Sequence, residues 1–246
     1  MCERLGKDPV SLSPEDVSPT PEELLRHPEL ALVPLQDMQL RFLVLRNFNR
    51  RLMDLLPLVD LSRPDRDQGL AYLIRQLRGL MLKHLKLQLF QKVLSRSAKD
   101  GNPTVVNINR LKASTFKATG RCDVRGRRTV FGQLFQAFSA KPAELLRKKN
   151  RAWKVVFQGE YADDYGGPYR ESIAQLSQEL QSPQLPLLVP VANHRNQVDQ
   201  NQDRWVPNPN ASSPVALKMF EFLGQLMGVA IRTLNPLELS LPRIVR

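Results

Sequence analysis

The chain has 246 residues, of which 42% are hydrophobic and 24% charged, a composition typical of a soluble globular protein with one large domain or two ordinary ones. It has no uncharged apolar run of about 18 residues, so no membrane-spanning helix is expected, and its first residues lack the apolar core of a secretory signal. The two cysteines, Cys2 and Cys122, are too few for a disulfide framework or a zinc cluster. This usage favours a reducing intracellular location, the cytoplasm.

The formal net charge is +12, and the basic residues concentrate in two segments, 117–128 and 147–151. A basic balance can favour nucleic acid or an anionic membrane. The sequence contains no zinc-finger spacing, no aromatic RNA-recognition motif and no serine-arginine repeat. We therefore expect solvated basic faces and no nucleic-acid partner, and salt-sensitive binding of nucleic acid would contradict this expectation.

The first hundred residues predict a helical region behind a flexible tail. Residues 1–20 carry three prolines among polar side chains, which is typical of a linker or tail. Thr20 is followed by proline and two acids, the pattern of a helix start. Apolar residues then recur at three- and four-residue steps over 35–56 and again over 68–95. We predict two long helices in an antiparallel pair, within a helical region spanning residues 21–100.

The composition changes after the Gly- and Pro-containing breaker at residues 99–103. Alternating β-branched residues predict a strand over 104–110, and the basic segment 117–128 predicts an exposed loop. Thr129 can cap a helix whose apolar residues face a core. A second strand is expected at 153–157, directly before the most informative segment of the chain.

The remaining elements are a helix after Pro168 that continues to Leu180, a short strand within 186–190, a polar segment over 192–213 and a final helix from Pro214. Helices thus outnumber strands. The sequence predicts an α+β fold that is predominantly α-helical, with a few short strands.

The segment between the strand at 153–157 and the next helix reads as an acidic turn. Its predicted turn residues are Gly159, Glu160, Asp163, Asp164, Gly166 and Gly167. Glycine pairs permit positive φ angles that β-branched residues adopt only at a cost. Neighbouring carboxylates at a strand end point to opposite sides, so Asp163 and Asp164 converge poorly on one ion and are expected to cap the turn and helix. The three histidines have no ligand spacing either, so no metal and no cofactor are predicted.

Three ordered segments carry a resemblance to a known family. The first is Phe157-Gln158-Gly159-Glu160 with the acidic Gly-Gly turn and Arg170-Glu171, the second is residues 187–190 with 201–209, and the third is residues 220–232. Together they resemble the HECT ubiquitin-ligase catalytic domain, most closely that of the large HERC-type members. The resemblance covers residues 105–246, the N-terminal part of the larger HECT lobe.

The resemblance implies a ubiquitin-protein transferase, with ubiquitin and a ubiquitin-conjugating enzyme as partners. In the family a cysteine takes ubiquitin as a thioester and passes it to a substrate lysine, and that cysteine lies in a small C-terminal lobe. Neither Cys2 nor Cys122 has the family's cysteine context, so both are judged non-catalytic. We expect the chain to be an incomplete fragment that ends before the catalytic cysteine and is inactive alone.

One binding residue follows from the resemblance. In some relatives a tyrosine just before the Gly-Gly pair contributes to a noncovalent ubiquitin-binding surface, and Tyr165 occupies that position. The simpler interpretation is that Tyr165 covers the turn. The alternative function for the whole chain is a non-enzymatic protein-interaction module with a basic surface.

Overall fold

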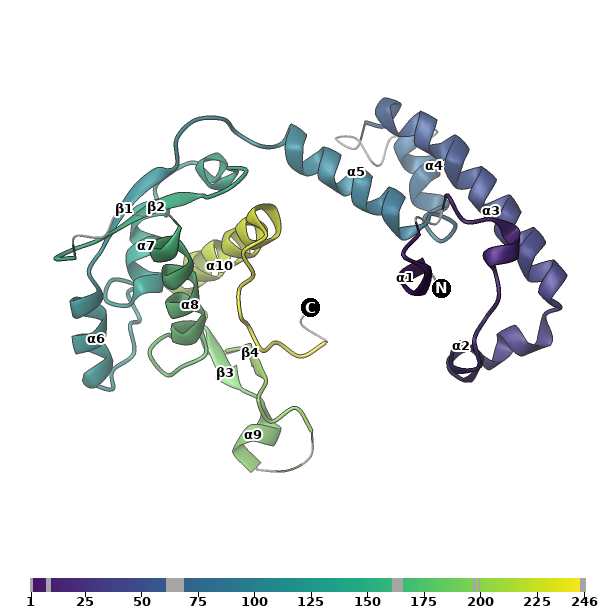
Figure 1. Ribbon diagram of the computed structural model, residues 1–246. Coiled ribbons are helices and arrows are strands. Elements are labelled where there is room, and N and C mark those ends of the chain that lie inside the picture. Colours follow the sequence, from purple (N-terminus) through teal and green to yellow (C-terminus); the bar gives the residue numbers. More distant parts are fainter. Residues whose placement is uncertain are drawn as a thin grey trace. The chain divides into compact units, whose positions relative to one another are not determined.

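The computed structural model describes residues 2–7, 10–60, 69–160, 166–196, 198 and 200–243, and it divides into two compact units, Met1–Arg96 and Ser97–Arg246 (Figure 1). Within the described residues, helices dominate and the strands are few and short. The predicted α+β, predominantly α-helical fold class is thus confirmed.

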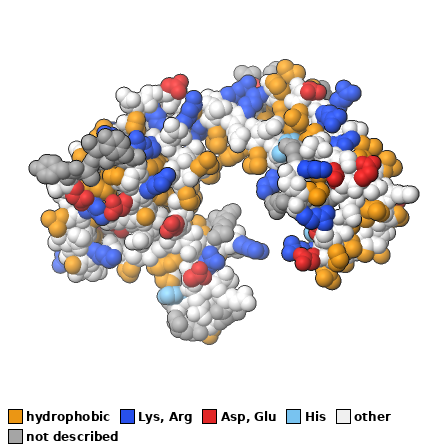
Figure 2. Space-filling view, viewed as in Figure 1, with side chains coloured by type: hydrophobic (Ala, Val, Ile, Leu, Met, Phe, Trp, Pro, Cys, Tyr) orange, Lys and Arg blue, Asp and Glu red, His pale blue; other side chains and the backbone are white. Residues whose placement is uncertain are grey.

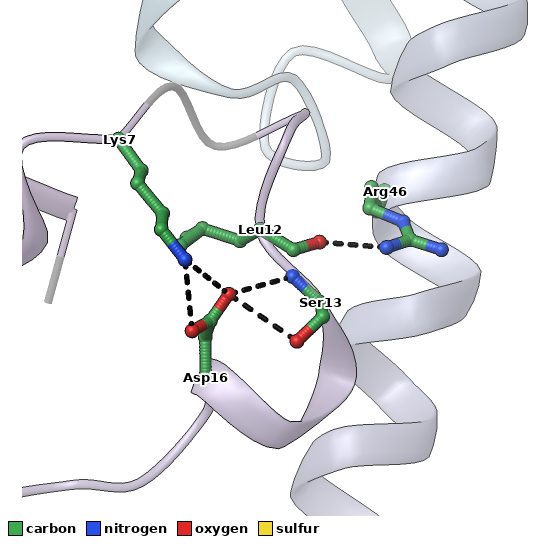
Figure 3. Close-up of polar contacts among 5 residues, drawn as sticks. All are labelled: Lys7, Leu12, Ser13, Asp16 and Arg46. Atoms are coloured by element: carbon green, nitrogen blue, oxygen red, sulfur yellow. Dashed lines mark hydrogen bonds and ion pairs between the residues drawn. The ribbon is translucent and has the colours of Figure 1, made fainter.

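The first unit begins with short helical turns. They are α1 (Cys2–Leu5), η1 (Pro14–Asp16), α2 (Pro21–Arg26) and η2 (Pro28–Leu32). Where the sequence predicted a flexible tail, the side chain of Leu12 is fully buried. The Arg46 guanidinium donates to the Leu12 carbonyl at 2.6 Å, and Asp16 accepts from the Ser13 backbone N–H at 2.9 Å (Figure 3). A buried leucine and a capped turn therefore hold part of this segment against α3 (Leu35–Leu55).

The core of the first unit lies between α3, η3 (Leu56–Leu58), α4 (Leu70–Gln76) and α5 (Lys83–Arg96). Its buried apolar residues are Leu52, Leu56, Val59, Ala71, Ile74, Met81 and Leu85. The prediction of one helix over 68–95 is wrong, because a turn separates α4 from α5. The fully buried Asn49 of α3 donates to the Leu80 carbonyl at 2.9 Å and accepts from the Leu82 N–H at 2.8 Å. This amide satisfies backbone groups that a continuous helix would have paired internally.

The second unit contains, in chain order, β1 (Thr104–Ile108), α6 (Arg110–Ala118), α7 (Val130–Phe138), η4 (Ala143–Leu146), β2 (Trp153–Phe157), α8 (Gly167–Leu180), β3 (Leu188–Pro190), α9 (Ala192–Asn196), β4 (Trp205–Pro207) and α10 (Pro214–Thr233). The strands β1 and β2 pair in parallel from Thr104↔Trp153 to Ile108↔Phe157. The strands β3 and β4 pair antiparallel. The predicted strand at 153–157 is confirmed, and the strand predicted over 104–110 ends at Ile108, because Asn109 already caps α6. The parallel pairing places the carboxyl ends of both strands at one edge.

The helix α7 is the apolar centre of the second unit. Thr129 caps it by accepting from the Gly132 N–H at 3.0 Å, as predicted. Phe131 and Phe135 contact the ring of Phe222 on α10, and Phe138 contacts Trp153 on β2. These aromatic contacts join α7, α10 and β2 into one core.

The helix α10 is long and apolar enough to cross a membrane by length and composition alone. Its N-cap is Ser213, as predicted. Met219, Phe222 and Leu226 are buried in the core of the second unit. This burial accounts for the apolar composition of α10 as that of a core helix, and a membrane span is not established.

Candidate functional site

The turn between β2 and α8 carries the predicted site residues, and two glycines shape it. Gly159 has φ 84° and Gly166 has φ 117°, and Gly166 is the residue before α8. Gly167 does not share this geometry, because it is already the first residue of the helix, followed by Pro168 in the first turn. The prediction of a positive φ thus holds for Gly166 and not for Gly167.

Three of the predicted residues, Asp163, Asp164 and Tyr165, lie outside the described residues. The described ends of the turn are Gln158–Glu160 on one side and Gly166 on the other. Both ends are fixed by contacts, so the position at which the chain leaves β2 and enters α8 is defined.

Arg110, the first residue of α6, holds these two ends together. Its guanidinium contacts Glu160 at 3.3 Å and Glu171 of α8 at 2.5 Å. It also lies over the ring of Phe157, 4.7 Å from the centroid. The parallel pairing of β1 and β2 explains the placement, because α6 starts directly after β1 at the edge where β2 ends. We refer to this set as the Arg110 clamp.

Arg110 could not be predicted from the sequence, because its partners are 50 and 61 residues away. The side chains of the clamp are one-third to one-half exposed, so each ion pair contributes less than about 1 kcal/mol. The clamp therefore acts mainly by fixing the end of β2 relative to the start of α8.

An open groove of about 940 Å³ lies beside the clamp, between α6 and α8. Leu111, Ser114 and Lys117 line one wall, and Ala174, Gln175 and Gln178 line the other. Leu111 is 75% exposed. No cluster of three metal-ligating side chains occurs in the described part of the chain. A groove with mixed apolar and amide walls suits a polypeptide better than a metal ion.

A second polar arrangement organises the basic loop at the start of α7. Asp123 is buried and accepts from the backbone N–H groups of Arg127, Arg128 and Thr129 at 2.6–3.0 Å. Glu179 of α8 is also buried and accepts from Val130 at 2.9 Å and Phe131 at 2.8 Å. The arginine side chains of the loop remain exposed, as predicted. The two carboxylates thus bind the amide groups that a helix N-terminus leaves unpaired.

Burial raises the pKa of Glu179 to about 7, and the hydrogen bonds from Phe131 and Val130 oppose this shift. The negative charge of Asp123 also contributes to the raised pKa. The contacts of Glu179 could not be predicted, because the sequence around a glutamate near a helix end does not indicate a distant partner.

Comparison with known proteins decides the family. No family model matches the chain. HERC2 of Mus musculus, an E3 ubiquitin-protein ligase, is 34% identical over 224 residues that cover 88% of the chain, and HERC2 of Homo sapiens has the same identity and coverage. The probable E3 ubiquitin-protein ligase HECTD4 of Homo sapiens is 27% identical over 98% of the chain. The chain is homologous to HECT-type E3 ubiquitin-protein ligases.

The predicted HECT-type resemblance, with HERC-type proteins among the relatives, is thus confirmed. The chain spans about 5% of the length of the HERC2 proteins and 6% of HECTD4. An alignment over 88% of the chain is longer than the second unit, Ser97–Arg246, and so includes part of the first. The likeness to HECT-type ligases therefore extends beyond the residues 105–246 that carry the motifs.

Cys122 is an exposed free thiol in the loop built on Asp123. Partial burial raises its pKa, and the charge of Asp123 raises it further. The thiolate is the nucleophilic form, so both effects lower the reactivity of Cys122 at neutral pH. Cys2 begins α1 in the first unit.

Proposed function

We propose that this chain acts in ubiquitin transfer as part of a HECT-type ligase. In this proposal the complete ligase accepts ubiquitin as a cysteine thioester from a conjugating enzyme and passes it to lysines of protein substrates. The observation that carries the proposal is the 34% identity to two E3 ubiquitin-protein ligases over 88% of the chain. The expected cellular location is the cytoplasm.

Neither cysteine of the chain is proposed as the catalytic one. The raised pKa of Cys122 disfavours the thiolate that ubiquitin transfer requires. We therefore expect the 246-residue chain to form no thioester by itself.

A thioester assay tests this directly. The chain is incubated with activating enzyme, conjugating enzyme and ubiquitin, and the products are separated with and without reductant. No reducible ubiquitin adduct is expected. An adduct that persists in Cys2→Ser and disappears in Cys122→Ser would instead identify Cys122 as the acceptor.

We propose noncovalent ubiquitin binding at Tyr165 and its surroundings. Support comes from the clamped geometry of the turn and from the adjacent α6–α8 groove, whose Leu111 presents exposed apolar surface. Amide shift changes in ¹⁵N-labelled ubiquitin report binding. Tyr165→Ala is expected to weaken the changes, whereas Leu217→Ala, on an exposed position of α10, serves as the control. Equal shifts with wild type and Tyr165→Ala would remove Tyr165 from the site.

A non-enzymatic interaction module is the second candidate, favoured by the surface of the first unit. Figure 2 shows hydrophobic side chains among Lys and Arg over this unit. Leu40 and Val44 of α3 and Leu73 of α4 are 60%, 63% and 48% exposed. Such a patch fits a protein partner. This function would be favoured by a protein partner that binds the chain in the absence of ubiquitin and no longer binds when Leu40 and Val44 are replaced.

A further inference from the structure

The loops that precede β1 and β2 meet at the amino-terminal edge of the parallel pair. The register Thr104↔Trp153 aligns the strand starts, and the Lys99 N–H donates to the Arg147 carbonyl at 2.8 Å. Basic residues from both loops therefore lie together, although nearly fifty positions separate them in sequence. From sequence alone, the basic segment 147–151 was predicted only to form a solvated face.

These loops enclose a hollow of about 310 Å³, which we call the cation pocket. Its lining residues are Lys99, Asp100, Gly101, Pro103, Lys148, Lys149, Asn150 and Arg151. Four of these eight residues are cationic and one is acidic. The pocket is distinct from the α6–α8 groove and from the turn that carries Tyr165.

Lys148 is the informative member, because it is only 8% exposed. Its ammonium donates to the Asp100 carbonyl at 2.7 Å, and no carboxylate of the described residues pairs with it. An ammonium carries three N–H donors, so this contact uses one of them. A buried charge without an opposite charge is costly, and an anion in the pocket would offset that cost.

Gly101 lets the chain pass close to the ammonium. Its φ is 103°, and a Cβ at this position would lie 3.4 Å from the Lys148 Nζ. A side chain there would be strained and would occupy space beside the cation. Glycine therefore leaves the approach to Lys148 open.

The acidic side chains near the pocket neutralise its positive charge only weakly. The Asp100 carboxylate lies 3.7 Å from the Lys149 ammonium, and its side chain is 95% exposed. Glu144 lies 3.3 Å from the Lys99 ammonium with a side chain that is 56% exposed. Exposed pairs of this kind are weak and open readily to a stronger anion.

We propose that the cation pocket binds the phosphate group of a phosphate monoester or of free phosphate. Lysine ammonium groups bind phosphate as compact point charges, and a guanidinium group can also donate to phosphate oxygens. Three of the four cations are lysines, and they come from the two loops that line the pocket. The pocket accepts a phosphate group and not a metal ion or a cationic ligand.

The test titrates the whole ¹⁵N-labelled chain with inorganic phosphate and with O-phosphoserine at constant ionic strength. The two probes distinguish free phosphate from phosphate on a protein side chain. We expect saturable amide shifts at Gly101 and Asn150, and tighter binding of one probe identifies the source. Acetate at the same ionic strength is expected to leave these shifts unchanged.

Four variants test the pocket: two should weaken phosphate binding, one should strengthen it and one is a control. Lys148→Met keeps the aliphatic stem and should weaken binding about tenfold or more. The double variant Lys99→Met/Lys149→Met removes two exposed cations without touching the buried one and should also weaken it. Asp100→Asn removes the competing carboxylate and should strengthen binding about two- to fivefold. The exposed Lys112→Met, on α6, is the matched control and should bind as wild type.

Two outcomes would overturn the proposal. One is equal phosphate affinity in wild type and in both lysine-to-methionine pocket variants. The other is an acetate response as large as the phosphate response, because general screening of surface charge would then explain the shifts.

Discussion

Two charged turns in the second unit are built in opposite ways. The loop before α7 is organised from inside, where buried Asp123 and Glu179 accept backbone N–H groups. The turn after β2 is held from outside, where exposed Arg110 pairs with Glu160 and Glu171. Losing a buried acceptor leaves donors unpaired, whereas losing an exposed ion pair leaves groups that water can bind. The first turn should therefore dominate stability, and the second should mainly set geometry.

The largest effect is expected from Asp123→Asn. An amide in this position keeps only one acceptor oxygen, places an NH2 donor against backbone N–H donors and removes the negative charge, so the unfolding free energy should fall by about 3 kcal/mol. Both tryptophans, Trp153 and Trp205, lie in the second unit, so their fluorescence in denaturant measures this transition. Asp100→Asn, whose side chain is 95% exposed, is the control. A loss below about 0.5 kcal/mol for Asp123→Asn would show that the buried acceptor is dispensable.

The pH dependence of the second unit tests Glu179. Its folded pKa of about 7 lies above the ordinary value of 4.5, so the folded state holds this proton more tightly than the unfolded state. The associated stability is complete below pH 4.5 and is lost as the pH rises through about 7. Across this window the unfolding free energy linked to the Glu179 proton falls by about 2–3 kcal/mol in total.

Glu179→Gln removes the titration, so the difference in unfolding free energy between wild type and variant should change with pH in this window. Fluorescence-monitored denaturation at pH 4.5, 6 and 8 measures it. A pH-independent difference would place the folded pKa at its ordinary value and leave the two N–H bonds as the whole contribution of Glu179.

A smaller effect on the unfolding free energy is expected at the Arg110 clamp. Arg110→Ala should lower the unfolding free energy by about 1 kcal/mol, because it removes two exposed ion pairs and the contact with Phe157. Half of this loss should vanish at about 1 M salt, where screening is strong. Arg125→Ala, at an exposed position in the Asp123 loop, should change little. A loss at Arg110 as large as that at Asp123 would contradict the contrast between the turns.

The smallest effect concerns reactivity at Cys122. In a Cys2→Ser background, alkylation of Cys122 at pH 7 should be slower than that of an unperturbed exposed thiol, because its pKa is raised. The rate should still rise with pH above the ordinary pKa of a thiol. A rate that is already maximal at pH 7 would mean a stabilised thiolate, and the judgement that Cys122 is non-catalytic would then fall.

Local signals in the sequence were sufficient for elements whose determinants are adjacent. Thr20, Thr129 and Ser213 cap the helices that follow them, because a capping side chain acts within three residues. The strands β1 and β2, predicted over 104–110 and 153–157, likewise follow from their own β-branched and aromatic residues.

Features that depend on distant partners could not be predicted. The turn that interrupts the predicted helix 68–95 is hydrogen-bonded by Asn49, which lies more than 30 residues away in the sequence. Arg110 and Glu179 reach partners about 50 residues away, and no pattern within a short window specifies such pairs. The candidate site was thus located by its glycines and motif, while the residues that position it required the structure.

The parallel pairing of β1 and β2 has a consequence for the order of folding. Each ladder contact joins residues 49 positions apart, and Arg232 of α10 bonds to Ser97 across 135 positions. The first unit closes its core within residues 52–85. During synthesis the first unit can complete its contacts while β2 is still unmade, whereas the second unit must wait for nearly its whole length. Since distant contacts close slowly, the ligase motifs should be the last part of this chain to mature on the ribosome.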